Sequence, residues 1–247
     1  MSRNGSGRSR IAGREWVLWL LTVGPVVAVF LLVPDPDWLT LCSAVIGITS
    51  VLLIAKGWVL GEFLTAAFTG FYGAVAAFNG FYGEVISAFA ITLPLSVLSI
   101  IAWIRHPFPE SGEVEVGGRI PKKQIVLLLV MTPLIAVSFF FLLRSLGTVN
   151  AEIGTASVAL NAAAAFMKIA RNPYFPLVYG VNDLVLITLW VLASLSDSSN
   201  IPMVACFLGF LISDIYAWIS WIQMKARQKQ TREREESGRI PGTEDTQ

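Results

Sequence analysis

Charged residues are scarce in this sequence: they form 14% of its 247 residues, whereas soluble domains carry about 25%. The net charge is only +1, which lacks the basic excess that a nucleic-acid-binding surface requires. The two cysteines, Cys42 and Cys206, lie in apolar runs without CxxC spacing, so no disulfide framework or zinc site is expected. The single histidine, His106, has no second histidine for a metal site. We therefore expect no metal, no cofactor and no nucleic-acid partner.

Long apolar runs dominate what is present, since 55% of the residues are hydrophobic. A helix crosses the hydrocarbon core of a bilayer in about 20 residues, and a chain this apolar is not disordered. The sequence predicts an all-α polytopic membrane protein in the lipid bilayer, with eight transmembrane helices. The predicted spans are Trp16–Val33, Trp38–Ala55, Leu60–Phe78, Tyr82–Ile104, Ile125–Leu143, Thr148–Lys168, Phe175–Leu195 and Ile201–Gln223.

The distribution of basic residues tests this count. With eight spans, all Lys and Arg residues except Arg144 fall on the side that holds both termini. Cytoplasmic loops of membrane proteins are enriched in Lys and Arg, so we expect both termini to be cytoplasmic in a multi-pass protein of the bacterial plasma membrane. The outer loops are acidic instead; they contain Asp35, Asp37, Glu152 and Asp197. The charged tail from residue 224 to 247 is predicted to be solvated.

Some features inside the spans have local consequences. The alanines of the sixth span, Ala156, Ala159 and 162–165, favour a tightly packed inner helix over one that faces lipid. Glu62 and Glu84 lie near span ends, where we expect their carboxylates to reach the membrane interface. Pro94 in the fourth span and Pro133 in the fifth are each compatible with a kink or a hinge.

The chain contains a weak internal duplication. Ile-x-Ala-Trp-Ile occurs at 100–104 and again at 215–219, and the same offset of 115 residues aligns 54–56 with 169–171. The matches pair spans 2–4 with spans 6–8. Because spans 2 and 6 run in the same direction, the repeats are parallel, as in the SWEET sugar carriers, whose substrate sites lie between repeats.

This duplication gives a 1+3+1+3 layout with five parts. The predicted parts are an N-terminal region and additional helix (1–37), a first three-helix repeat (38–104), a loop and linker helix (105–147), a second three-helix repeat (148–223) and the charged tail (224–247).

The layout, with a basic turn inside each triplet and a tryptophan at each triplet's end, resembles the PnuC-like family of bacterial vitamin transporters. Family members carry nicotinamide riboside, and relatives carry thiamine, riboflavin or deoxynucleosides. The resemblance covers roughly residues 39–221 and implies facilitated uptake, trapping of the substrate by a separate kinase, and a homo-oligomer such as a trimer.

Two family patterns are only partly kept. Where the family has Trp-x-x-Trp-x-x-x-Asn, this chain has Phe175, Val178 and Asn182. Where the last helix commonly has Asn-Gly-x-x-x-Trp, this chain has Ser213-Asp214 and then Trp218. The resemblance therefore carries the asparagine and one tryptophan over to this chain, and implies substrate contact by Asn182.

Two acidic residues lie deep in the predicted spans. Asp183 and Asp214 are both about 13 Å from the cytoplasmic face at 1.5 Å per residue. Ionisable groups at this depth cost at least about 2.5–3.5 kcal/mol and usually serve a function, although two hydrogen-bonded packing groups remain an alternative. Asn182 adjoins this pair and offers both a donor and an acceptor to a ribose hydroxyl or a carboxamide.

Aromatic side chains in the same triplets are candidates to stack on a flat heterocycle, with an added cation–π attraction if the ring is a pyridinium. The candidates are Tyr179, Tyr216, Trp218 and Trp103. Trp and Tyr also gather at membrane interfaces, and we assign Trp221 to such a belt.

The sequence thus predicts a transporter for a small molecule, nicotinamide riboside or a related vitamin or nucleoside, rather than an enzyme. A SWEET-like sugar carrier is the nearest alternative, because only the preference of the pocket would differ. A membrane-embedded enzyme is less favoured, since one histidine outside every span leaves most catalytic sets incomplete.

Overall fold

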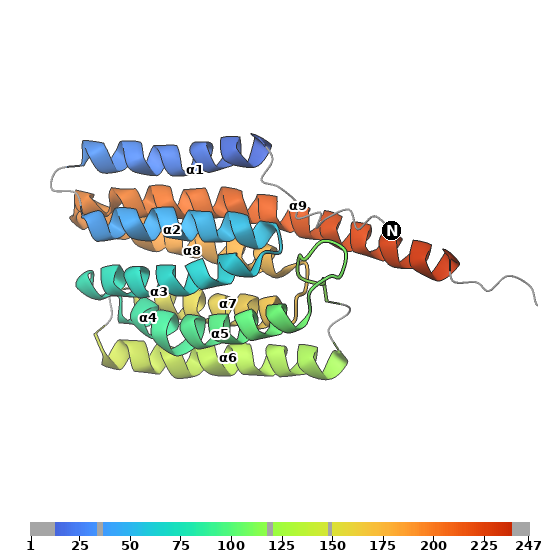
Figure 1. Ribbon diagram of the computed structural model, residues 1–247. Helices are drawn as coiled ribbons and strands as arrows, with labels where there is room; N and C mark the ends of the chain where they lie inside the picture. The colour runs from blue at the N-terminus through green and yellow to red at the C-terminus, as the bar shows by residue number, and fades with distance from the viewer. Residues whose placement is uncertain (1–12, 34–36, 118–120, 148–149, 239–247) are drawn as a thin grey trace, which may run out of the picture.

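The computed structural model describes residues 13–33, 37–117, 121–147 and 150–238. It is a bundle of long helices that run roughly side by side (Figure 1). The predicted Asp35 and the basic residues before Gly13 lie outside the described residues. The elements are α1 (Gly13–Leu32), α2 (Trp38–Ala55), α3 (Val59–Phe78), α4 (Tyr82–Ile86), the π-helix η1 (Ser87–Thr92), α5 (Leu93–Arg105), α6 (Lys122–Ser145), α7 (Ala151–Ile169), α8 (Phe175–Ser196), the 3₁₀ turn η2 (Ser198–Asn200) and α9 (Ile201–Gly238).

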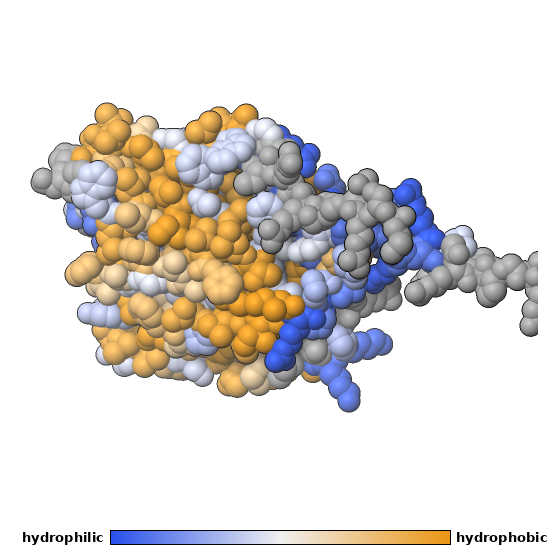
Figure 2. Space-filling model, viewed as in Figure 1, coloured by the Kyte–Doolittle hydropathy of each residue, from blue (hydrophilic) through white to orange (hydrophobic). Residues whose placement is uncertain are grey.

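Seven segments of the described chain are long and apolar enough to cross a membrane. Six are α1, α2, α3, α8, the α6 stretch 128–145 and the α9 region, and the seventh is the continuous run from α4 through α5. Hydrophobic residues cover the body of the molecule, and hydrophilic ones gather at one end (Figure 2). The remaining predicted span, the sixth, is α7; it is helical but less apolar, because Glu152 and Lys168 lie in its first and last turns. Ala159, Ala164 and Ala165 of α7 are buried, as expected for an inner helix.

Successive helices alternate in direction, so the described chain begins and ends at the same end of the bundle (Figure 1). We call it the basic end; α2, α5 and α7 finish there and α3, α6 and α8 begin there. Its basic residues include Lys56, Arg105, Lys122, Lys123, Lys168 and Arg171. The other end is called the acidic end, because Asp37 and Asp197 lie there.

The fourth predicted span is interrupted immediately before Pro94. The six residues of η1 form a π-helix that leads directly into α5. Proline lacks an N–H, so the helical turn that precedes Pro94 has one hydrogen bond fewer to hold it in α geometry. By contrast, α6 continues through Pro133.

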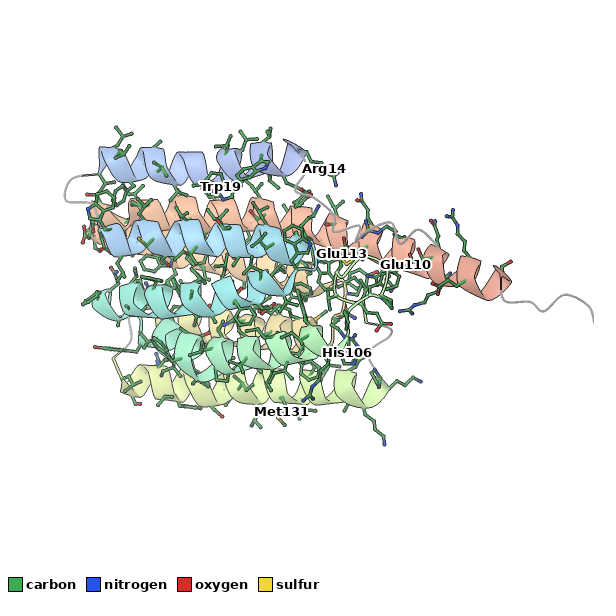
Figure 3. All side chains as sticks on the ribbon, viewed as in Figure 1. Arg14, Trp19, His106, Glu110, Glu113 and Met131 are labelled. Atoms are coloured by element: carbon green, nitrogen blue, oxygen red, sulfur yellow. The ribbon has the colours of Figure 1, made fainter. Side chains whose placement is uncertain are left out.

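The core lies between α2, α3, α8 and α9: α2 packs against α3 and α9, and α8 packs against α9. Helix α1 packs on the outside against α2 and α9, and α6 packs on the opposite side, mainly against α7 (Figure 1). In the apolar part of α6, residues 128–145, only 6% is buried inside the protein. Met131 on this helix points away from the bundle (Figure 3). Such a face suits contact with lipid chains.

The loop of residues 106–117 folds across the basic end, where His106, Glu110 and Glu113 are found (Figure 3). The N–H of Val114 donates to the Gly57 carbonyl, and the N–H of Gly117 donates to the Arg171 carbonyl. The loop thereby joins the α2–α3 turn to the α7–α8 turn.

The extension of α9 fixes this loop in place. Arg227 is paired with Glu113 at 2.5 Å, and the Gln228 side chain both donates to Val114 and accepts from Val116. The prediction of a solvated tail is therefore wrong at Gln228, which is 3% exposed, whereas the neighbouring Arg227 is exposed.

Candidate functional site

A cavity lies in the middle of the bundle; the space free of atoms is about 770 Å³, and this figure includes the open space at its mouth. Its lining comes from both predicted triplets, whereas no described residue of α1 or α6 contributes. The lining residues are Ser50, Val51 and Ile54 of α2; Thr65, Phe68, Thr69 and Tyr72 of α3; Glu84 and Thr92 of α4 and η1; Asn161 and Lys168 of α7; Phe175, Tyr179, Asn182, Asp183 and Leu186 of α8; and Phe207, Phe210 and Asp214 of α9.

Aromatic rings close the cavity toward the acidic end. Tyr72 packs against Trp190 and Phe207, and Trp190 in turn contacts Phe81 edge-on. Phe68 stacks on Tyr72 at 5.4 Å between ring centroids, with an angle of 18° between the planes. The apolar walls therefore offer flat faces of the kind on which a heterocycle stacks.

Three of the polar side chains that the sequence singled out meet in this cavity. Asn182, Asp183 and Asp214 line it, and each is about 5–6% exposed. The Asn182 Oδ1 and Asp183 Oδ2 atoms are buried without a hydrogen-bond donor among the described residues. Since buried polar atoms are normally satisfied, these two acceptors are available to a ligand.

A buried ion pair lies between this cavity and the basic end. Lys168 Nζ is 3.0 Å from Glu62 Oε2, and the two side chains are 2% and 0% exposed. The ammonium also lies 5.5 Å from the centre of the Tyr179 ring, within range of a cation–π attraction. The expectation that Glu62 reaches the interface is wrong, because α7 supplies a cation that holds its carboxylate inside.

Glu84 is also buried rather than interfacial, at 3% exposure. It accepts a hydrogen bond from the Tyr72 hydroxyl at 3.1 Å. The turn at Gly80, which has a positive φ of 70°, brings α4 back against α3 so that the two side chains meet.

Asn161 is a lining residue that the sequence analysis missed. Its Nδ2 donates to Ser87 Oγ at 2.7 Å and to Thr92 Oγ1 at 2.6 Å, the first and last residues of η1. An asparagine in the alanine-rich α7 was the available signal, because an isolated amide within a span requires a partner.

Of the four predicted aromatic residues, Tyr179 lines the cavity and the other three lie elsewhere. The Tyr216 hydroxyl donates to Glu15 of α1 at 2.9 Å, on the outer side of α9. Trp218 and Trp103 are likewise absent from the cavity lining. A one-residue step on a helix rotates the side chain by about 100°, so residues close to Asp214 in sequence do not share its direction.

Trp103 and Trp221 form a cluster at the basic end with Phe175. Trp103 Nε1 donates to the Lys168 carbonyl at 3.3 Å, and Trp221 Nε1 donates to the Ile54 carbonyl at 2.9 Å. Each tryptophan ends one predicted triplet and bonds to the last turn of the first helix of the other. The placement of Trp221 in an interfacial belt is therefore wrong: it is fully buried.

Long apolar helices around a central cavity that both triplets line are the features expected of a multi-pass membrane transporter. The model of the nicotinamide mononucleotide transporter family matches residues 37–223, and the chain belongs to this family. This membership confirms the prediction of a PnuC-like transporter rather than an enzyme.

Two relatives agree with this assignment. The chain is 24% identical over 217 residues to a nicotinamide riboside transporter PnuC of Neisseria mucosa, with 86% of this chain and 81% of the relative aligned. A crystal structure of the vitamin B3 transporter PnuC has the same fold, with a TM-score of 0.77 and 21% identity over 89% of this chain and 94% of the other.

Proposed function

We propose that this protein facilitates uptake of nicotinamide riboside across the bacterial cytoplasmic membrane. The observation that carries the proposal is the central cavity, which combines aromatic walls with a buried amide and two carboxyls in a chain of the nicotinamide mononucleotide transporter family. Nicotinamide riboside has the matching parts: a flat cationic pyridinium, a carboxamide and a ribose.

Each part of the substrate has a partner in the cavity. The pyridinium stacks on the aromatic walls, where Phe68, Tyr72 and Tyr179 present their rings. The unsatisfied Asn182 Oδ1 accepts from the carboxamide or a ribose hydroxyl. Asp183 and Asp214 supply the negative charge that attracts the cationic pyridinium.

The two triplets are proposed to be parallel repeats in a 1+3+1+3 arrangement of eight spans, with α1 added and α6 as the linker. Two observations support this: the reciprocal bonds of Trp103 and Trp221, and the matched turns at Gly57 and Arg171, which both have positive φ. The turn positions correspond at an offset of 114 residues, one less than the sequence match at 54–56. Substrate would cross as one triplet rocks against the other around the cavity.

In the cell, movement is proposed to be downhill, with a separate kinase that traps the substrate by phosphorylation. The basic end is assigned to the cytoplasm, so both termini are cytoplasmic. The protein is proposed to form a homo-oligomer, with a trimer as the family resemblance implies and one pathway in each protomer. The bare outer face of α6 supports contact with lipid or with a second copy.

Uptake by liposomes that contain the purified protein tests the substrate. We expect labelled nicotinamide riboside to enter protein-containing liposomes faster than empty ones and to equilibrate without an added energy source. Labelled thiamine, a labelled deoxynucleoside and labelled glucose are tested in the same way for comparison. Preferred entry of glucose would favour the sugar-carrier alternative, and no entry of nicotinamide riboside would refute the proposal.

A further inference from the structure

Two carboxyl groups meet inside the cavity. Asp183 of α8 and Asp214 of α9 are 5% and 6% exposed, line the same cavity and influence each other electrostatically. Asp183 Oδ2 has no hydrogen-bond donor among the described residues, and Asp183 is a lining residue of the cavity. Two carboxyls can hydrogen-bond to each other only when one of them holds a proton.

The charged and titratable groups around this pair leave its charge largely uncompensated. Lys168 of α7 is the one cation in the cavity lining among the described residues, and Glu62 of α3 already pairs with it. Glu84 of α4 adds a further carboxyl and bonds to Tyr72. The remaining titratable neighbours, on α8 and α9, are Tyr179 and Cys206, and the lining residues of α2 and η1 carry no charge: Ser50, Val51, Ile54 and Thr92.

Two adjacent carboxylates in a medium of low dielectric constant repel each other strongly, and desolvation penalises each of them. A shared proton relieves both costs, as it does in carboxyl dyads where only one group ionises. A monocation between the two groups would relieve them equally well.

We propose that Asp183 and Asp214 form a proton-binding site in the cavity and that the cationic substrate displaces this proton. The inference rests on the proposed function, since the displacing cation is the pyridinium of nicotinamide riboside. The balance is simple: the proton leaves the carboxyl pair for water as the monocation enters. The charge of the site is the same before and after the exchange, so neither state places an additional charge in the membrane.

Proton release on binding tests the exchange directly. Nicotinamide riboside is added to the purified detergent-solubilised protein in weak buffer with a pH indicator, and the affinity is measured from pH 5 to pH 9. We expect a net release of protons. The affinity should fall by up to about tenfold for each unit by which the pH decreases, because protons compete with the cationic riboside for the carboxyl pair. The uncharged dihydropyridine form of the same riboside should bind without proton release and with little dependence on pH.

Variants locate the effect. Asp183→Asn and Asp214→Asn should each abolish the proton release and flatten the pH dependence. Asp197→Asn, at an exposed carboxyl of the acidic end, serves as the control and should behave as the parent protein does. If nicotinamide riboside binds with no proton release and with an affinity independent of pH, the proton site is refuted while the proposed function stands.

An infrared measurement tests the site without any substrate. The protonated carboxyl gives a C=O stretching band in the empty protein, which should disappear in Asp183→Asn/Asp214→Asn and persist in Glu84→Gln. An unchanged spectrum in the double variant would refute the shared proton even if no riboside binds. A lost band together with no binding of either riboside would retain the proton site, refute its displacement by this substrate and refute the proposed function.

Discussion

At the scale of single residues, Asn182 carries the clearest expectation. It is buried on α8, lines the cavity and has an Oδ1 without a donor among the described residues. We expect Asn182→Ala to weaken binding of nicotinamide riboside by about 5–150-fold, because the loss of a hydrogen-bond partner to a buried ligand costs about 1–3 kcal/mol. Equilibrium binding to purified protein measures this change.

Two control variants separate a binding defect from a folding defect. Thr188→Ala removes an exposed hydroxyl of the same helix, which among the described residues bonds to the Leu184 carbonyl alone, and its affinity should be that of the parent. Tyr216→Phe removes the bond to Glu15 on the outer side of α9 and should also leave the affinity unchanged. A loss at Tyr216 equal to that at Asn182 would contradict the placement of the site.

The sequence predicted the polar centre of the site because charged and amide groups are rare within spans. Asn182, Asp183 and Asp214 therefore stood out, and the structure brings them into one cavity. Lys168 and Glu62 did not stand out, since each lies near a helix end, where a long side chain normally reaches water. Their burial depends on the approach of α3 to α7, which no local pattern in either helix encodes.

At the scale of the helices, the Glu62–Lys168 ion pair joins the two triplets. Removal of one partner leaves the other charge buried and uncompensated, which costs about 3–5 kcal/mol in folded proteins. We expect Glu62→Gln and Lys168→Met to lower the thermal midpoint of the detergent-solubilised protein, and the double variant to be more stable than either single variant. Thermal unfolding followed by circular dichroism measures the four proteins.

The exposed pair Arg144–Glu152, at 3.8 Å between side chains that are 64% and 65% exposed, provides the matched control. Exposed pairs contribute about 0–1 kcal/mol, so Glu152→Gln should change the midpoint little. Additive losses in the Glu62/Lys168 double variant would show that the two side chains act independently and would contradict the ion pair.

Element boundaries were the most predictable part of the fold, since Pro, Gly, Asn and Asp mark the turns; α2 begins and ends at the predicted residues. The helix register inside the repeats was less predictable. The Ile-x-Ala-Trp-Ile match pairs Trp103 with Trp218, whereas the hydrogen bonds make Trp221 the counterpart of Trp103. A short sequence match reflects only the identity of the residues, whereas the structural equivalence of two helices depends on which face of each packs inward.

At the scale of the whole molecule, charge divides the bundle into two ends. The basic end carries the 106–117 loop and the α9 extension, where Arg227 pairs with Glu113 and Arg232 with Glu115. At the acidic end, the Ser199 backbone N–H donates to the Asp197 carboxylate at 2.9 Å and lowers the pKa of this exposed group. Asp197 therefore stays ionised at neutral pH and somewhat below.

This asymmetry predicts the orientation of the protein in the membrane. We expect Asp197→Cys to react with a membrane-impermeant maleimide added outside intact cells, and Lys225→Cys to react only after the membrane is permeabilised. Both variants are made with Cys42→Ser, because Cys42 is an exposed native thiol, whereas Cys206 is buried. The Cys42→Ser protein without either added cysteine gives the background.

The expectation follows from the enrichment of Lys and Arg in cytoplasmic loops and from the common end shared by Gly13 and the α9 extension (Figure 1). External labelling at Lys225→Cys but not at Asp197→Cys would reverse the orientation, and external labelling at both would show that α9 does not cross the membrane.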